Sequence, residues 1–402
     1  MGSERIRPYQ ILLLFMSQAY LCIALDATKL LVWIARRVAA SAGSSTSKAF
    51  LAYFALSAAM TICTSNDIVV LTLTPVILEF ASARQVDAEP FVISSFFAAN
   101  VWSLILLIGN PTNIIVGEAF QVTFPLYFQW MALPSIIVGS LLLLALWFLF
   151  KDQIQGHQDS TEEHEAIFDQ VHVDWSSAKF GSFVLASCLF LLTISPLINA
   201  PLYVITLCCS SLYALRNAIY FGCKSREKFQ LEGTGENKIT VQDFWLPFRN
   251  LPWAVVPFVC SMFILLECLS RHGWISRVAS LMIAISPSPL TSGFSFLLVG
   301  TLLGNLMNNQ PMTIFMTKVL IECVTRFSEK TLRIAIFSLI VASNVAANFT
   351  AVGALAGIMW TKIIREKGLF VSPKRFFFFG SITMIPLASL FVLILLAQVQ
   401  TF

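Results

Sequence analysis

The chain of 402 residues is 57% hydrophobic and only 12% charged, whereas a soluble domain carries roughly 25% charged residues. This composition, with a mean hydropathy of +0.78, excludes a soluble enzyme, a disulfide scaffold and a nucleic-acid-binding protein as first interpretations. The net charge of +4 is too small to indicate a charged macromolecular partner. We therefore expect a multi-pass integral membrane protein that contacts lipid and does not bind nucleic acid.

Apolar stretches recur along the whole chain. A membrane-spanning helix needs about 20 mostly apolar residues, and the sequence offers about ten such segments. They fall at about 9–34, 48–80, 89–121, 126–150, 180–199, 200–221, 251–271, 274–286, 292–325, 331–363 and 376–398. The first has basic residues before it, as a signal peptide would, but it lacks a convincing small-residue cleavage site and is taken as a membrane helix. The sequence thus predicts an all-α polytopic membrane protein.

Four of these stretches are too long for one crossing, and a polar cluster interrupts each of them. The clusters are Thr64–Asp67, Gly109–Asn113, Asn308–Thr313 and Ser343–Gly353. A helix breaks at membrane depth only where protein or a water-filled cavity satisfies the freed backbone groups. Paired interruptions in two halves of a chain are typical of a secondary transporter whose half-helix ends converge on the substrate. The alternative is that the clusters are ordinary loops between short helices.

The order of the four stretches predicts two inverted repeats, each with a re-entrant hairpin and a broken helix. We expect the first repeat at 1–150, with its hairpin at 48–80 and its broken helix at 89–121. An acidic linker at 151–179 follows. The second repeat then occupies 180–402, with its hairpin at 292–325 and its broken helix at 331–363. The positive-inside rule places 35–48, 222–250 and 362–375 in the cytoplasm, and the linker with them.

Asp67 is the clearest single candidate for a functional residue, because its carboxylate lies between two apolar runs. Intramembrane ionisable residues are rare and indicate function by default. Asp67 is therefore a candidate to bind a coupling proton or sodium ion, with Ser65 and Asn66 supplying further oxygens. The alternative is that Asp67 caps the half-helix that starts at Ile68.

The clusters supply donors and acceptors without net charge, which suits a neutral hydroxylated solute or an anion held by half-helix N-termini. The predicted substrate- or ion-binding residues are Ser65, Asn66, Asp67, Asn110, Thr112, Asn113, Asn308, Asn309, Thr313, Asn344, Asn348 and Thr350. No catalytic residue, metal site or cofactor is predicted, apart from coupling H⁺ or Na⁺. The chain has no GxxxxGK[ST] phosphate loop and no Ser/His/Asp constellation, so we expect no enzymatic activity and expect coupling to come from an ion gradient or an external ATPase.

Four motifs carry a resemblance to a known group. SNDIVVLTLTPVI resembles the NDxxxLxLTP element of the ion transporter superfamily, which contains the arsenite permeases, the P protein, sodium/proton antiporters and citrate carriers. IGNPTNIIVG looks like the element that follows it. GNLMNNQPMTIF is similar to the second hairpin of the arsenite permeases, and SNVAANFTAVGALAGIMWTKIIREKG to their last broken helix. In that helix the permeases usually carry Asp-x-Gly-Pro-Lys where this chain has Asn344 to Asn348.

The resemblance implies an inverted-repeat transporter, expected as a homodimer that moves its hairpins like an elevator, in a chain that begins after the family's first two helices. The first functional hypothesis is a secondary active transporter of a small inorganic oxyanion or its neutral acid, such as arsenite or antimonite, coupled to protons or sodium. A second is a citrate or dicarboxylate carrier, and a third is a Na⁺/H⁺ antiporter. A channel or a non-transporting scaffold is the alternative from a different class.

Overall fold

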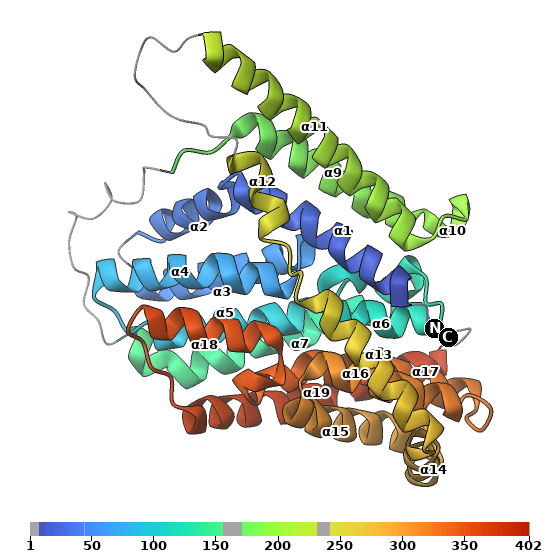
Figure 1. The fold of residues 1–402 in the computed structure, drawn as a ribbon. Helices are drawn as coiled ribbons and strands as arrows, with labels where there is room; N and C mark the ends of the chain where they lie inside the picture. The colour runs from blue at the N-terminus through green and yellow to red at the C-terminus, as the bar shows by residue number, and fades with distance from the viewer. Residues whose placement is uncertain (1–7, 44, 156–170, 231–241, 402) are drawn as a thin grey trace. The chain divides into compact units, whose positions relative to one another are not determined.

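The structure, a computed structural model, describes residues 8–43, 45–155, 171–230 and 242–401 (Figure 1). These residues form helices, with no β-strand among them, which confirms the all-α fold class. The chain divides into two compact units. The described residues of the large unit lie within Ala35–Gln170 and Val259–Phe402, and those of the small unit within Arg7–Ile34 and Val171–Phe258.

In the small unit the helices are α1 (Pro8–Ala27), α9 (Trp175–Thr193), α10 (Ser195–Ile198), α11 (Leu202–Gln230) and α12 (Gln242–Arg249). Helices α1, α9 and α11 pack against one another. Ser17 on α1 donates its hydroxyl to Thr206 Oγ1 on α11 at 2.7 Å. Because lipid gives apolar helices no hydrophobic reason to associate, close packing and hydrogen bonds of this kind hold them together.

The first half of the large unit runs from two paired helices to one long helix. Its elements are α3 (Thr46–Cys63), α4 (Asn66–Arg84), α5 (Glu89–Trp102), the 3₁₀ turn η1 (Leu107–Gly109), α6 (Pro111–Ala119) and α7 (Phe124–Gln155). Helices α2 (Leu30–Ser41) and α13 (Val255–Arg271) contain residues of both units.

The second half of the large unit repeats this order of elements. It contains α14 (Trp274–Ile285), α15 (Pro289–Met307), α16 (Asn309–Cys323), α17 (Glu329–Val345), η2 (Ala346–Asn348), η3 (Ala351–Gly353), α18 (Leu355–Glu366) and α19 (Pro373–Thr401). Thus α3 to α7 and α15 to α19 are each a helix pair with a short break, a broken helix with 3₁₀ turns, and a long closing helix.

Local chemistry explains where the helices break. Asn110 has an extended backbone and its side chain accepts a hydrogen bond from the Thr112 amide at 3.1 Å, with Pro111 at the first helical position of α6. Such a cap satisfies a helix-end donor, and proline at the first position needs no donor of its own. Asn308, at a φ of 77°, turns the chain between α15 and α16 and accepts from the Gln310 amide.

The packing of the two halves comes in matched pairs. The hairpin helices α3 and α15 pack on the broken helices α5 and α17 of their own half. The second helix of each hairpin also packs on the distal part of the other half's broken helix, α4 on α18 and α16 on α6. In Figure 1, α3 and α4 lie towards the left of the view and α15 and α16 towards the right.

The beginning and the end of the hairpin α3–α4 lie next to each other. Arg84, the last residue of α4, donates to the carbonyl oxygen of Gly43, which precedes α3. The two helices also pack on each other, so they form an antiparallel pair.

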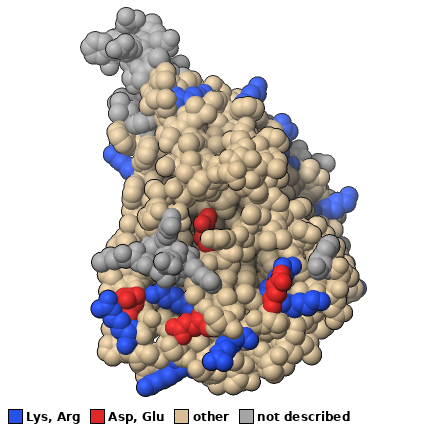
Figure 2. Space-filling model, turned by 90° about the vertical axis from the view of Figure 1, so that its right-hand side faces the viewer, with Lys and Arg blue, Asp and Glu red and all other residues tan. Residues whose placement is uncertain are grey.

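Nine helices in the described part of the chain are long and apolar enough to cross a membrane. The pair α13 and α14, which meet at 77°, raises the number to ten if it counts as one broken span. Figure 2 shows a mostly uncharged face, on which Lys and Arg are scattered and Asp and Glu are few. The multi-pass membrane architecture expected from the composition is therefore confirmed.

Some boundaries differ from the expected ones. The stretch 9–34 is two helices, because Lys29 adopts a φ of 65° and ends the first helical run. The break in 89–121 begins at Ser103, before the Gly109 cluster, because α5 ends at Trp102. Most of the predicted acidic linker, 156–170, and part of the polar stretch 222–250, at 231–241, lie outside the described residues.

Candidate functional site

Asn344, on α17, is the centre of a buried hydrogen-bonded cluster in the large unit. Its Oδ1 accepts from Asn110 Nδ2 and from Ser103 Oγ, each at 2.8 Å. Its Nδ2 donates to Asn113 Oδ1 at 2.7 Å and to the Ile340 carbonyl at 2.9 Å. The broken helices of the two halves are therefore joined by side-chain amides at the level where both are interrupted.

Thr112 adds to this contact. Ser343 Oγ donates to Thr112 Oγ1 at 2.9 Å, and Thr112, Ser343 and Asn344 all have no exposed surface. Buried polar groups are stable only when they are hydrogen-bonded, so this part of the cluster is a well-satisfied network that fixes the two breaks against each other.

Asn100 forms a second centre, on α5. It accepts from Asn66 Nδ2 at 3.1 Å and donates to Asn348 Oδ1 at 2.8 Å. Asn348 in turn donates to the Met384 sulfur at 3.3 Å. This row of three asparagines connects the start of α4 in the first half with η2 in the second half.

The hairpin asparagines Asn66 and Asn309 stand in equivalent places, each as the first residue of the second hairpin helix. Asn309 Nδ2 donates to the Ser343 carbonyl at 3.1 Å, as Asn66 donates to Asn100. The Oδ1 atoms of both are buried and accept no hydrogen bond from any described residue. An unsatisfied buried acceptor is costly, so each of these oxygens is a candidate ligand for a cation or a donor group of a substrate.

Asp67 is half-buried in the first turn of α4. The residue at the N-cap of α4 is Ser65, which makes no side-chain capping bond, so Asp67 is not the helix cap. No ion pair to Asp67 is present among the described residues. A carboxylate in the first turn is stabilised by the helix dipole, and Asp67 is free to hold a proton or a cation next to Asn66.

Three predicted residues hold the ends of the broken segments instead of joining the amide cluster. Asn308 donates to the Val352 carbonyl at 3.1 Å, and Thr350 donates to Asn305 Oδ1. Thr313 donates to the Asn309 carbonyl at 2.6 Å, within its own helix. The remaining predicted residues, except Ser65 and Asp67, belong to the cluster.

Asn100, Ser103 and Asn305 were missed. Asn100 and Ser103 are fully buried and stand in the run FFAANVWSL, one polar residue at a time. The same argument that singled out Asp67, a polar group at membrane depth, applies to Asn100. Asn100 has no neighbouring Pro or Gly, so the sequence pattern does not predict a helix break there.

The cluster contains no Lys or Arg. Lys318, which follows the second hairpin break, pairs with Glu267 at 3.7 Å, and Glu79 pairs with Arg36 at 3.2 Å. Within the described part of the chain, no three His, Cys, Asp or Glu residues are grouped to hold a metal ion. The site therefore offers neutral amides, hydroxyls, half-helix ends and one carboxylate.

Comparison with known proteins gives a consistent result. A family profile described as "Citrate transporter" matches residues 8–342. The arsenical pump membrane protein of Escherichia coli K12 is 24% identical over 380 residues, which cover 92% of this chain and 82% of that protein. An uncharacterized transporter of Mycobacterium tuberculosis is 24% identical over 327 residues, covering 77% and 68%. An uncharacterized transporter of Synechocystis is 22% identical over 393 residues, covering 92% and 82%.

Proposed function

The chain belongs to the citrate transporter family, and from that premise we propose that it is a secondary active transporter of a small inorganic oxyanion or its neutral acid. Arsenite and antimonite are the leading substrates, because the arsenical pump membrane protein is similar over 92% of this chain. We propose a proton or sodium gradient as the driving force. The family match agrees with the resemblance to the ion transporter superfamily that the four motifs carry.

The observation that carries the proposal is the uncharged amide cluster at the four helix breaks. Its two unpartnered oxygens, Asn66 Oδ1 and Asn309 Oδ1, are buried in equivalent places of the two halves. Amide oxygens are suitable ligands for a hard cation such as Na⁺, and the adjoining helix N-termini favour an oxyanion. A coupling ion and a small oxygen-rich solute can therefore be held side by side without a fixed positive charge.

The matched packing supports an arrangement of two inverted repeats around this site. Helix α4 packs on α18 just as α16 packs on α6, which is what a two-fold relation between the halves requires. In transporters built this way, the repeats alternate around a fixed central site near the bilayer midplane. We propose that the hairpins α3–α4 and α15–α16 move during that alternation.

Coupled transport of citrate or a dicarboxylate is the second candidate, favoured by the description of the matching family. A carboxylate would use the same half-helix N-termini and would rely more strongly on a bound cation. Arsenous acid, which is neutral at pH 7, would need less compensation. The two candidates therefore differ in how strongly binding depends on sodium or on a proton.

The decisive experiment is uptake into proteoliposomes made with purified protein. Radiolabelled or mass-detected arsenite, antimonite and citrate are each offered with an inward proton gradient, an inward sodium gradient, or neither. We expect one substrate to accumulate above equilibrium with one gradient and to stop accumulating when an ionophore collapses it. Flux that is unaffected by the collapse would indicate a channel and contradict the proposal.

A binding measurement supports the uptake experiment without requiring transport. A ligand that binds the folded protein raises its apparent stability by mass action. The true substrate is expected to raise the melting temperature of the wild-type protein and to have less effect on Asn309→Ala. Ser389→Ala, at a half-buried position of α19 outside the amide cluster, is the control that retains the full shift.

A further inference from the structure

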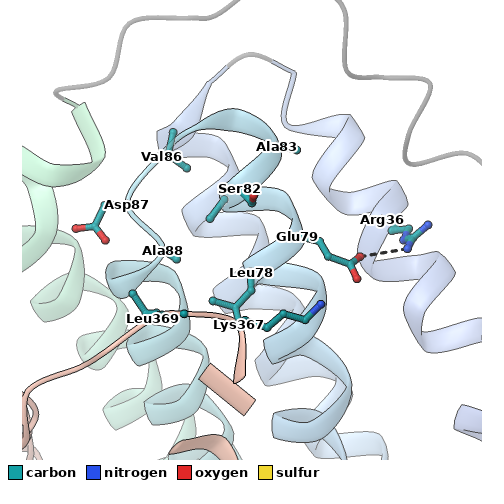
Figure 3. Close-up of a pocket in the computed structure, with 12 residues that line it drawn as sticks. Arg36, Leu78, Glu79, Ser82, Ala83, Val86, Asp87, Ala88, Lys367 and Leu369 are labelled. Atoms are coloured by element: carbon teal, nitrogen blue, oxygen red, sulfur yellow. Dashed lines mark hydrogen bonds and ion pairs between the residues drawn. The ribbon is translucent and has the colours of Figure 1, made fainter. Parts of the chain in front are cut away.

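A cavity of about 750 Å³ lies at the far end of α4 from the amide cluster. It is lined by residues of α2, of the last turns of α4, and of the loops that follow α4 and α18 (Figure 3). Ser82 on α4 is fifteen residues from Asp67, or roughly 20 Å at the helical rise. The cavity therefore lies at the opposite end of α4 from the central site.

Two basic side chains, Arg36 and Lys367, line this cavity. Arg36 pairs with Glu79 through Nη2 at 3.2 Å, but its Nε is buried and has no hydrogen-bond partner among the described residues. Lys367 lines the cavity and forms no ion pair in the described part of the chain. Figure 3 shows the Lys367 side chain extending toward the Arg36–Glu79 pair.

The acidic residues of the cavity are already engaged. Glu79 accepts from Arg36. Asp87 Oδ1 accepts from the Glu89 amide at 2.9 Å, at the start of α5, and Figure 3 shows the Asp87 carboxylate on the opposite side of the cavity, directed away from Lys367. The end of the cavity at Arg36 and Lys367 thus holds two cations against one carboxylate.

We propose that this end of the cavity is a capture site for a small anion, a carboxylate or oxyanion, held by Arg36 and Lys367 before it reaches the central cluster. Arg36 and Lys367 both line the cavity and can form charge-assisted hydrogen bonds to an anion held there. A concave surface with an excess of positive charge also raises the local concentration of an anionic solute.

This inference rests on the proposed transport function for its biological role, and it favours the second candidate substrate, citrate or a dicarboxylate, over arsenous acid. Because the central cluster has no basic residue, the positive charge that would select an anionic substrate is the charge of the cavity at Arg36 and Lys367. A substrate captured by Arg36 and Lys367 is anionic, as citrate is, whereas arsenous acid at pH 7 gains nothing from these side chains.

The test measures binding of an anion in the cavity through the protection of a cysteine placed in its lining. Ser82, which is exposed and lines the cavity, is replaced by Cys in a background without the nine native cysteines. The rate of its reaction with a maleimide is then followed in purified protein as citrate is added. We expect citrate to slow the reaction saturably and an equal concentration of glycerol to leave it unchanged. Ser41→Cys, exposed on α2 but outside the cavity lining, is expected to react at the same rate throughout.

Charge variants decide whether the basic residues are responsible. Lys367→Gln is expected to raise the half-protecting citrate concentration about 3- to 10-fold. Lys362→Gln is the matched control, because Lys362 is exposed on α18, pairs with Glu366 and does not line the cavity. Glu79→Gln removes the ion pair to Arg36 and is expected to lower the half-protecting citrate concentration, which is the opposite of the effect of Lys367→Gln. A loss of packing alone would not give opposite effects.

Absence of citrate protection, or an equal effect of Lys367→Gln and Lys362→Gln, would overturn the capture site. This outcome is distinguishable from failure of the proposed function. If Asn309→Ala transports normally, the central assignment is wrong while the protection of Ser82→Cys still reports on the cavity.

Discussion

Asn110 and Asn344 stand 234 positions apart in the sequence and share a hydrogen bond of 2.8 Å. Asn110 caps α6 in the first half, and Asn344 lies in the last turn of α17 in the second. The bond therefore ties one helix break to the other. Through Asn113 and Ser103 it extends to four side chains, so the two breaks form a single structural unit on which the proposed binding site depends.

Replacing Asn110 by Ala and replacing Asn309 by Ala are expected to have different effects on stability and on transport. Asn110→Ala removes a helix cap and a buried bond to Asn344, which should lower the free energy of unfolding by about 1–3 kcal/mol. Asn309→Ala removes one buried bond and an oxygen that has no partner, so it should lose transport with a smaller loss of stability. Melting temperatures and uptake rates of the two variants, measured side by side, check this. Normal transport by Asn309→Ala at wild-type expression would remove the second hairpin from the site.

Asp67→Asn separates coupling from a structural role. The change removes a charge from the first turn of α4, which should cost about 0.3–1 kcal/mol through the helix dipole. It also removes a group that can exchange a proton or neutralise a cation. We expect a folded protein that exchanges substrate at equal concentrations but no longer accumulates it against a gradient. Counterflow and gradient-driven uptake in the same proteoliposomes provide the measurement, and unchanged accumulation with unchanged pH and sodium dependence would contradict the assignment.

The proposed inverted-repeat arrangement predicts which face of the membrane each hairpin opens to. Single cysteines replace Ser41 and Ala83, on either side of the first hairpin, and Ser328, after the second, in the cysteine-free background. Because Arg84 contacts Gly43, the first two should react with an impermeant thiol reagent from the same face. Ser328→Cys should react from the opposite face. Labelling of all three from one face would exclude the inverted arrangement.

Gly380→Ala is expected to disrupt the second broken helix. A Cβ at this position would overlap the carbonyl oxygen of Asn348, the residue that accepts from Asn100. Forcing extra volume into a packed site usually costs about 1–3 kcal/mol, and here backbone must move. We expect a lower melting temperature together with reduced transport, measured against Ser389→Ala on the same helix. A wild-type melting temperature would show that η2 tolerates displacement.

The membrane class, the helical fold and the presence of the four breaks could be predicted from the sequence, although the break in 89–121 begins earlier, at Ser103. These properties depend on composition and on short-range signals, such as Asn110 before Pro111 or two asparagines at 308 and 309 inside an apolar run. A helix in lipid must satisfy its own backbone, so a polar interruption within a long apolar stretch is informative by itself. Nine of the twelve predicted site residues either join the amide cluster or flank it as Ser65 and Asp67 do.

Only the tertiary structure decided which polar groups meet. Asn100 has no neighbouring Pro or Gly to mark a break, and it becomes a centre of the cluster because it hydrogen-bonds to both Asn66 and Asn348. Thr350 has the same residue type as Thr112 but bonds to Asn305 outside the cluster. The cavity at Arg36 and Lys367 likewise depends on α2, α4 and the loop after α18 coming together. Hydrogen bonds and cavities form between side chains hundreds of positions apart, and sequence spacing along one helix holds no information about such partners.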